Sequence, residues 1–113
     1  MPSTNDFSGY QAMWLMALFD LPVGTDIQRK HATQFRKLLL SNGFLRLQYS
    51  VYGRFFPSEE ASVPVRTAVR QAVPEEGHVR LILLTDRQFG KMEVFHGENR
   101  LESETAPRQL LLF

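Results

Sequence analysis

Runs of apolar residues mark the expected strands of this chain. Residues 13–19 are continuously apolar, which predicts a strand that is covered on both faces and ends at Asp20. Residues 78–85 (HVRLILLT) predict another strand, and a short connection at 86–90 leads to a further predicted strand at 91–96. These segments predict a sheet in which Asp20 lies at the carboxyl end of the first strand.

Residues 44–56 alternate between apolar and polar positions, which predicts a single long strand with two unlike faces. One face carries Leu47, Tyr49 and Val51. The other carries Arg46, Gln48, Ser50, Tyr52 and Arg54. We therefore expect one face in the core and one polar face that combines arginines with an aromatic side chain.

Two segments follow the helical period instead. The first begins at Thr25 or Asp26, either of which can cap a helix, and ends at the Asn42–Gly43 pair. Its apolar positions are Ile27, Ala32, Phe35, Leu38 and Leu39, and its opposite side carries Arg29, Lys30, Arg36 and Lys37. The second helix spans roughly residues 58–72, with Pro64 in its first regular turn.

The order β-α-β-α-β-β predicts an α+β domain at residues 10–100, with a ferredoxin-like antiparallel sheet and two helices on one face. Residues 1–9 are polar and predict a flexible extension. Residues 101–113 pass from a polar stretch to an apolar end at 109–113, which predicts an extra strand that docks on a partner subunit. Because the second face of the sheet needs a cover, we expect a homodimer.

Composition narrows the class of protein. A chain of 113 residues forms one domain, and 43% hydrophobic with 22% charged residues is typical of a globular protein. The absence of cysteine excludes disulfides and cysteine-containing zinc sites. The longest apolar run is far shorter than the ~20 residues of a membrane-spanning helix. Since the first residues show no signal-peptide pattern, the expected location is the cytoplasm.

Familiar catalytic motifs are missing. The sequence contains no glycine-rich phosphate loop, no HExxH pair and no serine in a GxSxG turn. His31, His78 and His96 lie far apart without ligand spacing, so we expect none of them to bind a metal. The formal net charge is +1, which means that only the placement of charge can indicate a nucleic-acid binder.

Asp20 is the strongest candidate for chemistry. It ends a strongly apolar strand, where we expect a partly desolvated carboxylate, and carboxylate oxygens are ligands that Mg²⁺ prefers. One carboxylate makes a poor site, but two copies related by a two-fold axis would make a better one. The alternative is that Asp20 caps the turn before Pro22. The sequence offers neither a histidine nor a second acid near Asp20 as a general base.

The basic residues also have two interpretations. The stripe on the first helix is the usual pattern of a solvated helix face. The polar face of residues 44–56 adds arginines beside an aromatic residue, and Arg87 follows the strand at 78–85. Arginines with a stacking aromatic are typical of phosphate-backbone binding, which favours a nucleic-acid interface.

Five segments occur in a characteristic order: FDLP at 19–22, FRKLLLSNGF at 35–44, QYSVYGR at 48–54, PEEGHVRLILLTDRQFGKM at 74–92 and HGE at 96–98. Together they resemble the small core CRISPR adaptation proteins, the second numbered Cas family, often called CRISPR-associated endoribonucleases, in the form found in type II systems. The QYSVY and TDRQF segments at this spacing are the most specific part. The resemblance covers about residues 10–113.

The resemblance implies a ferredoxin-like homodimer whose two sheets face each other, with each C-terminal strand completing the partner's sheet. It implies that the Asp20 carboxylates of both subunits share a Mg²⁺ ion and support endonuclease activity on single-stranded RNA or duplex DNA. It also implies a role in spacer acquisition, in which the dimer binds protospacer DNA and bridges two dimers of the larger CRISPR integrase.

The same resemblance implies roles for single residues. Arg46 would neutralise phosphate, and Ser50 and Tyr52 would shape the strand beside the metal. The expected nucleic-acid-binding set is Arg29, Lys30, Arg46, Arg54 and Arg87. Two alternatives stay open at this point: a purely structural DNA-binding scaffold in which Asp20 is not catalytic, and a toxin-like ribonuclease of the same fold.

Overall fold

The structure is a computed structural model, and it describes residues 12–97. Its elements in chain order are β1 (Met13–Asp20), α2 (Asp26–Ser41), β2 (Leu45–Gln48), β3 (Val51–Phe56), the 3₁₀-helix η1 (Glu60–Ser62), α3 (Val63–Ala72), β4 (His78–Thr85) and α4 (Asp86–Gly90). The expected extension at residues 1–9 and the docking segment at 101–113 lie outside the described residues.

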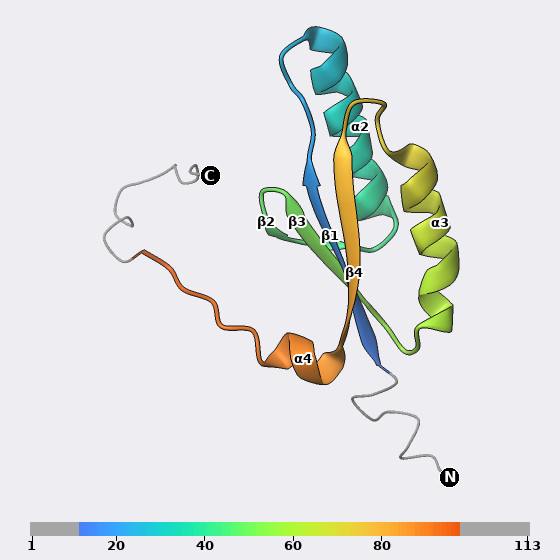
Figure 1. Cartoon of the computed structure of the whole chain (residues 1–113), viewed down its shortest axis with the longest axis vertical. Helices are drawn as coiled ribbons and strands as arrows, with labels where there is room; N and C mark the ends of the chain where they lie inside the picture. The colour runs from blue at the N-terminus through green and yellow to red at the C-terminus, as the bar shows by residue number, and fades with distance from the viewer. Residues whose placement is uncertain (1–11, 98–113) are drawn as a thin grey trace.

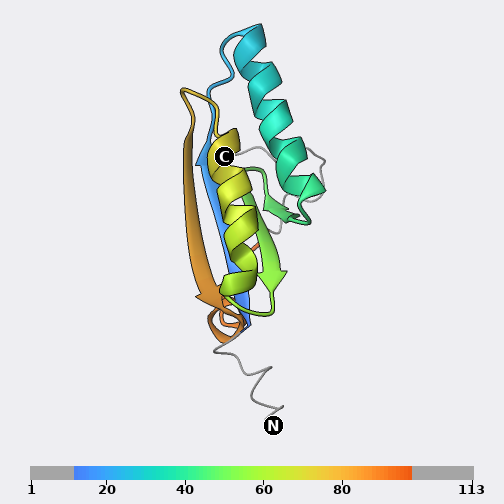
Figure 2. The same ribbon diagram turned by 90° about the vertical axis from the view of Figure 1, so that its right-hand side faces the viewer.

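The four strands form one antiparallel sheet in the order β2-β3-β1-β4, with β1 paired to both β3 and β4. Figures 1 and 2 show α2 and α3 on the same side of this sheet. The order β-α-β-β-α-β with this strand arrangement is ferredoxin-like. The predicted class, an α+β domain with an antiparallel sheet and helices on one face, is therefore confirmed.

The predicted long strand at 44–56 is wrong, because the chain turns back at Tyr49 and Ser50. β2 and β3 form a hairpin in which Gln48 lies opposite Val51, and the register is irregular between Arg46 and Gln48. The alternation of period two continues through this two-residue turn. The turn also lacks the glycine, asparagine or aspartate that usually marks a tight hairpin. The sequence pattern therefore concealed the reversal.

The predicted strand at 91–96 is also wrong: α4 follows β4 directly, and residues 92–97 have no regular secondary structure. A capping box starts α4. The Thr85 hydroxyl accepts from the backbone N–H of Gln88 at 3.0 Å, and the side-chain oxygen of Gln88 accepts from the backbone N–H of Thr85 at 2.9 Å. The sheet still has four strands because the hairpin supplies the one that this segment was expected to provide.

The core lies between the sheet and the two helices. Its buried residues are Leu15, Ala17, Phe19, Leu21, Ala32, Phe35, Leu39, Phe44, Tyr52, Phe56 and Val69. Of the predicted apolar positions of the first helix, Ala32, Phe35 and Leu39 are buried and Leu38 is half-buried, but Ile27 is 64% exposed. Figure 1 shows the reason, because the first turn of α2 extends beyond the end of the sheet.

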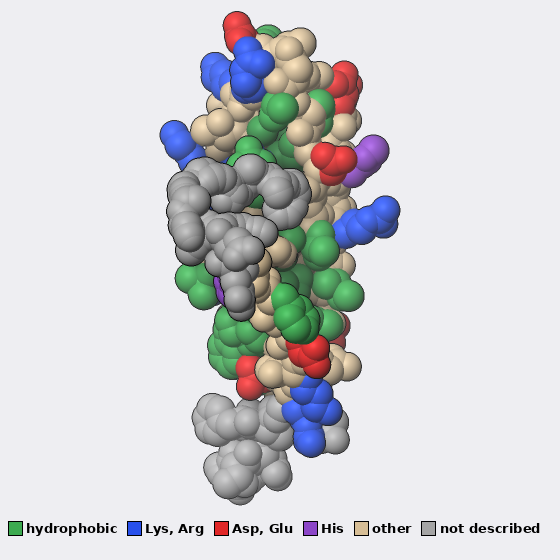
Figure 3. Space-filling view, turned by 90° about the vertical axis from the view of Figure 1, so that its left-hand side faces the viewer, with side chains coloured by type: hydrophobic (Ala, Val, Ile, Leu, Met, Phe, Trp, Pro, Cys, Tyr) green, Lys and Arg blue, Asp and Glu red, His purple; other side chains and the backbone are tan. Residues whose placement is uncertain are grey.

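The open face of the sheet is the face opposite α2 and α3. Because side chains alternate along a strand, it carries Trp14, Met16 and Leu18 of β1. Leu18 is 39% exposed; on the same face Phe55, opposite Trp14, is 45% exposed and Ile82, opposite Met16, is 48% exposed. Figure 3 views the molecule from the β2 edge of the sheet and shows apolar side chains there among charged ones. Within residues 12–97, therefore, β1 is covered fully on one face only, contrary to the prediction.

The predicted ends of the first helix are confirmed. Thr25 is the N-cap of α2, and it forms a capping box with Gln28. Asn42 is the C-cap, and Gly43 follows with a φ of 86°, a left-handed conformation that glycine adopts readily. These caps fix the path of the chain from Asp20 into the helix.

We expect Thr25→Ala to destabilise the protein by about 1 kcal/mol, because the backbone N–H of Gln28 loses the Thr25 hydroxyl that accepts from it at 3.1 Å. Equilibrium urea denaturation measures this change. Thr33→Ala is the matched control, since Thr33 is an exposed threonine within the same helix. Equal stability of the two variants would contradict the assigned cap.

Of the helices in residues 12–97, none combines the length and the apolar character that crossing a membrane requires.

Candidate metal and nucleic-acid site

Asp20 is the last residue of β1 and is exposed. The expected partial desolvation of its carboxylate is therefore wrong, because the residue lies on the open face, away from the helices that bury Phe19. The Phe19 amide donates to the Ser50 carbonyl oxygen at 3.1 Å, which places the β2–β3 turn beside the end of β1. Ser50 is thus hydrogen-bonded to the residue that precedes Asp20.

His78 begins β4 directly opposite Asp20 and is also exposed. Paired residues of antiparallel strands point to the same face with Cβ atoms roughly 4.5–5.5 Å apart. The expectation that no histidine lies near Asp20 is therefore wrong. No local signal could have revealed this pair, because only the β1–β4 register brings the two residues together. Two positions further along β4, the exposed Arg80 lies opposite Leu18 on the same face.

The donor set at this end of the sheet fits part of a metal site. Asp20 supplies one carboxylate and His78 one imidazole, and residues 12–97 contain no group of three or more such side chains placed to hold an ion. A hard divalent cation needs more oxygen ligands, which water and a second carboxylate can supply. The geometry is therefore compatible with an ion shared between two copies of Asp20.

Tyr52 does not belong to this site. It is 1% exposed, lies opposite Ala17 on the helix-covered face and has its ring centroid 5.4 Å from that of Phe19. The hairpin is the physical reason, because the turn at Tyr49 and Ser50 sends Tyr52 into the core. Ser50 is half-buried in the turn itself, next to the end of β1.

A cluster of two arginines and a tyrosine flanks the turn. The Arg36 guanidinium lies 4.5 Å from the ring centroid of Tyr49 and 5.5 Å from that of Phe19. The Arg46 guanidinium lies 5.0 Å from the Tyr49 ring, which is on a residue 59% exposed. The Nε of Arg36 is buried without a hydrogen-bond partner in the described part of the chain. Cation–π contacts hold this Arg36–Tyr49–Arg46 cluster together.

The other predicted nucleic-acid-binding residues lie elsewhere. Arg29 forms an ion pair with Asp26, so its charge is compensated. Arg54 donates to the Asn42 carbonyl oxygen at 2.6 Å and stacks on Phe56 at 4.4 Å. The remaining two are exposed: Lys30 and Arg87. Arg87 lies on α4, at the end of the sheet opposite Asp20.

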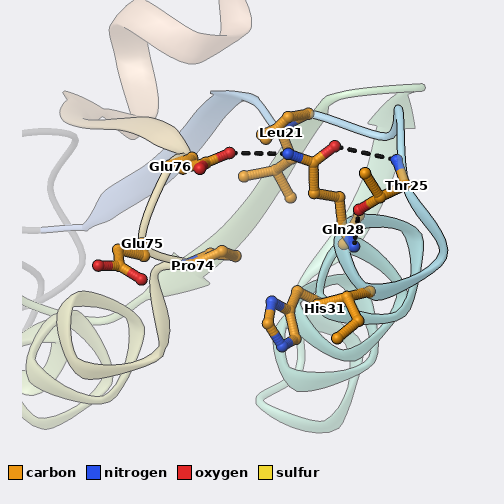
Figure 4. Close-up of a pocket in the computed structure, with 10 residues that line it drawn as sticks. Leu21, Thr25, Gln28, His31, Pro74, Glu75 and Glu76 are labelled. Carbon is orange, nitrogen blue, oxygen red and sulfur yellow. Dashed lines mark hydrogen bonds between the residues drawn. The ribbon is translucent and has the colours of Figure 1, made fainter.

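Several hollows open on the fold within residues 12–97. The first, about 230 Å³ in volume, lies between α2 and the α3–β4 loop, where the Gln28 amide group donates to Glu76 at 2.7 Å and His31 faces the opening (Figure 4). It contains none of the predicted site residues. Another, about 760 Å³, adjoins the open face and is lined by Met16, Leu47, Gln48, Val51 and residues 89–90 and 92–96.

The chain is similar in sequence to a family model and to several known proteins. A family model described as "CRISPR associated protein Cas2" matches residues 13–92. A protein of Flavobacterium psychrophilum, named CRISPR-associated endoribonuclease Cas2, is 40% identical over 104 residues, covering 92% of this chain and 90% of that protein. A protein of the same name from Parvibaculum lavamentivorans is 45% identical over 102 residues, covering 89% of this chain and 100% of the relative.

Two solved structures share the fold. The crystal structure of Streptococcus pyogenes Cas2 at pH 6.5 matches with a TM-score of 0.59 and 20% sequence identity, over 74% of this chain and 99% of that one. A second crystal structure of Cas2 matches with a TM-score of 0.55 and 17% identity, over 83% of this chain and 99% of that one. At these identities the likeness concerns the fold alone.

Proposed function

The chain belongs to the CRISPR-associated Cas2 family, and on that premise we propose that it is a homodimeric spacer-acquisition protein with metal-dependent endonuclease activity on single-stranded RNA or duplex DNA. The observation that carries this proposal is the position of Asp20, exposed at the end of β1 on the open face and opposite His78. The relatives named above are called endoribonucleases.

The open face supports the dimer. Leu18, Phe55 and Ile82 are large apolar side chains on one surface, each between 39% and 48% exposed. Burying apolar surface is favourable by about 25 cal/mol per Å², so a second copy that covers this face stabilises both. Asp20 lies on the same face, and two copies packed through it would bring two carboxylates toward one two-fold axis.

The proposed chemistry is phosphodiester hydrolysis at the paired Asp20 carboxylates, which would hold a divalent ion such as Mg²⁺. When bound, such an ion activates a water molecule and neutralises charge on the scissile phosphate. The exposed Arg80, two positions from His78 on the same face, adds positive charge beside the place where that phosphate would lie. Ser50 shapes the site through the bond between its carbonyl and the Phe19 amide.

The Arg36–Tyr49–Arg46 cluster supports the binding half of the proposal. The ion pair found within residues 12–97 joins Arg29 to Asp26, which leaves the charges of Arg36 and Arg46 without a carboxylate partner there. Stacking on Tyr49 limits the motion of both guanidiniums, and ordered guanidiniums suit phosphate contacts. We propose that this cluster holds protospacer DNA while the dimer bridges two integrase dimers in the cytoplasm.

We further propose that the chain is the form found in type II systems. The QYSVY segment at 48–52 and the TDRQF segment at 85–89 support this assignment. In the structure these segments form the hairpin turn and the capped start of α4, so both are local features with a defined geometry.

Salt-dependent binding tests the nucleic-acid interface. We expect labelled single-stranded RNA or duplex DNA to bind more weakly as salt rises, since each phosphate contact releases counterions. Arg46→Gln should weaken binding and make the negative slope of log affinity against log salt shallower by about 0.7–0.9, which is the contribution of one phosphate contact. Fluorescence anisotropy measures both. Arg29→Gln is the matched control, because the charge of Arg29 is paired with Asp26. Equal slopes for Arg46→Gln and the unmodified protein would contradict the assignment.

A further inference from the structure

We propose that His78 is a ligand of the divalent ion at Asp20, so that the site takes a first-row transition-metal ion such as Mn²⁺ in preference to Mg²⁺. This inference rests on the proposed function, because it assumes that Asp20 binds the ion. It adds a nitrogen ligand and a metal preference to that site.

The register of the β1–β4 pair places Asp20 and His78 side by side. Asp20 and His78 form the last pair of the β1–β4 ladder, in which eight consecutive pairs keep one register. A regular ladder fixes the backbone on both sides of the pair, and directly opposed side chains have Cβ atoms roughly 4.5–5.5 Å apart. A carboxylate and an imidazole at that separation can both reach one ion at about 2.0–2.2 Å.

The surroundings leave both side chains available. Asp20 and His78 are exposed, so neither packs in the core. The ion pair found within residues 12–97 involves Asp26 and Arg29, and Asp20 takes no part in it. Within residues 12–97 no third His, Asp or Glu joins the pair, so the other ligands would be water, substrate phosphate or the Asp20 of a second copy.

The chemistry of the donors determines the metal preference. Magnesium favours oxygen ligands and retains several waters, whereas an imidazole nitrogen raises affinity for first-row transition metals. A site with one imidazole for each carboxylate should therefore discriminate between Mn²⁺ and Mg²⁺. A site with oxygen ligands alone would lack the preference for Mn²⁺ over Mg²⁺ that an imidazole nitrogen adds.

Metal binding by the purified full chain tests the inference without measuring activity. The free Mn²⁺ signal in electron paramagnetic resonance gives the affinity for Mn²⁺, and competition by Mg²⁺ in the same samples gives the affinity for Mg²⁺. The variants are His78→Gln, His78→Asp and Asp20→Asn. His31→Gln is the matched control, because His31 is an exposed histidine on α2 beside the hollow of Figure 4.

We expect His78→Gln to weaken Mn²⁺ binding by about tenfold or more while Mg²⁺ affinity changes by less than about twofold. His78→Asp should raise Mg²⁺ affinity and narrow the preference for Mn²⁺, because a carboxylate suits both ions; a gain in Mg²⁺ affinity is a change that damage to the fold cannot imitate. His31→Gln should bind both ions as the unmodified protein does.

The outcomes separate this inference from the proposed function. Loss of both metals in Asp20→Asn, with His78→Gln and His78→Asp indistinguishable from the unmodified protein, would overturn the role of His78 and leave Asp20 as the ligand. Unchanged Mn²⁺ binding in Asp20→Asn would overturn the metal site itself. Equal weakening of Mn²⁺ and Mg²⁺ in His78→Gln, without a gain in His78→Asp, would show that His78 supports the site without ligating the metal.

Discussion

Replacing Asp20 by alanine is expected to reduce metal-dependent cleavage of single-stranded RNA or duplex DNA by at least about 10²–10³-fold. The estimate follows from the several kcal/mol that a bound metal ion contributes to transition-state stabilisation, at about tenfold in rate for each 1.36 kcal/mol. Removing the ion with EDTA should have the same effect on the unmodified protein. Because Asp20 is exposed at a strand end, Asp20→Ala should leave the fold intact.

The measurement is cleavage of both labelled substrates by the purified protein with Mg²⁺ or EDTA, beside the Asp20→Ala variant. Glu60→Ala is a suitable control, since Glu60 is an exposed acid in η1, outside the candidate site. Cleavage that persists in Asp20→Ala would reveal a contaminant or a different active site. An unmodified protein that cuts neither substrate but binds DNA in a salt-sensitive manner would favour the structural scaffold instead.

The fold class could be predicted from the sequence because its signals are local. The apolar run of β1, the caps of α2 and the helical period each depend on residues close together in the chain, and all three are confirmed. The reversal at Tyr49 and Ser50 could not be predicted, because the apolar–polar alternation of the sequence runs on through both residues. In the structure the turn breaks the alternation of faces, since Gln48 and Val51, three residues apart, are paired on one face. The sequence pattern therefore predicts the correct fold class but the wrong course of the chain through residues 44–56.

Only those residues of the candidate site that stand out by their own sequence position could be predicted. Asp20 stood out because one carboxylate follows a long apolar strand. Its neighbour His78 and the Arg36–Tyr49–Arg46 cluster depend on contacts between elements distant in sequence, and no spacing rule reveals them. Tyr52 was assigned to the site through the resemblance of the QYSVY segment, and the alternation that placed it on one face with Ser50 does not hold across the turn.

The reassignment of Tyr52 leads to the largest expected change in stability. Tyr52 is 1% exposed and packs against Phe19 in the core. We expect Tyr52→Ala to lower the free energy of unfolding by about 3–5 kcal/mol, through lost burial and the cavity that remains. That is a large part of the roughly 5–15 kcal/mol that stabilises a typical domain. Equilibrium urea denaturation at one fixed protein concentration measures the change.

Two further variants separate packing from catalysis. Tyr49→Ala removes a tyrosine that is 59% exposed at the neighbouring turn, and we expect it to cost less than about 1 kcal/mol of stability. Tyr52→Phe keeps the buried ring and should leave metal-dependent cleavage within about twofold of the unmodified rate, which is less than 0.5 kcal/mol of barrier. A stable Tyr52→Phe protein with strongly reduced cleavage would return Tyr52 to the active site. Because its ring lies on the helix-covered face and Asp20 lies on the open face, we expect that result to be absent.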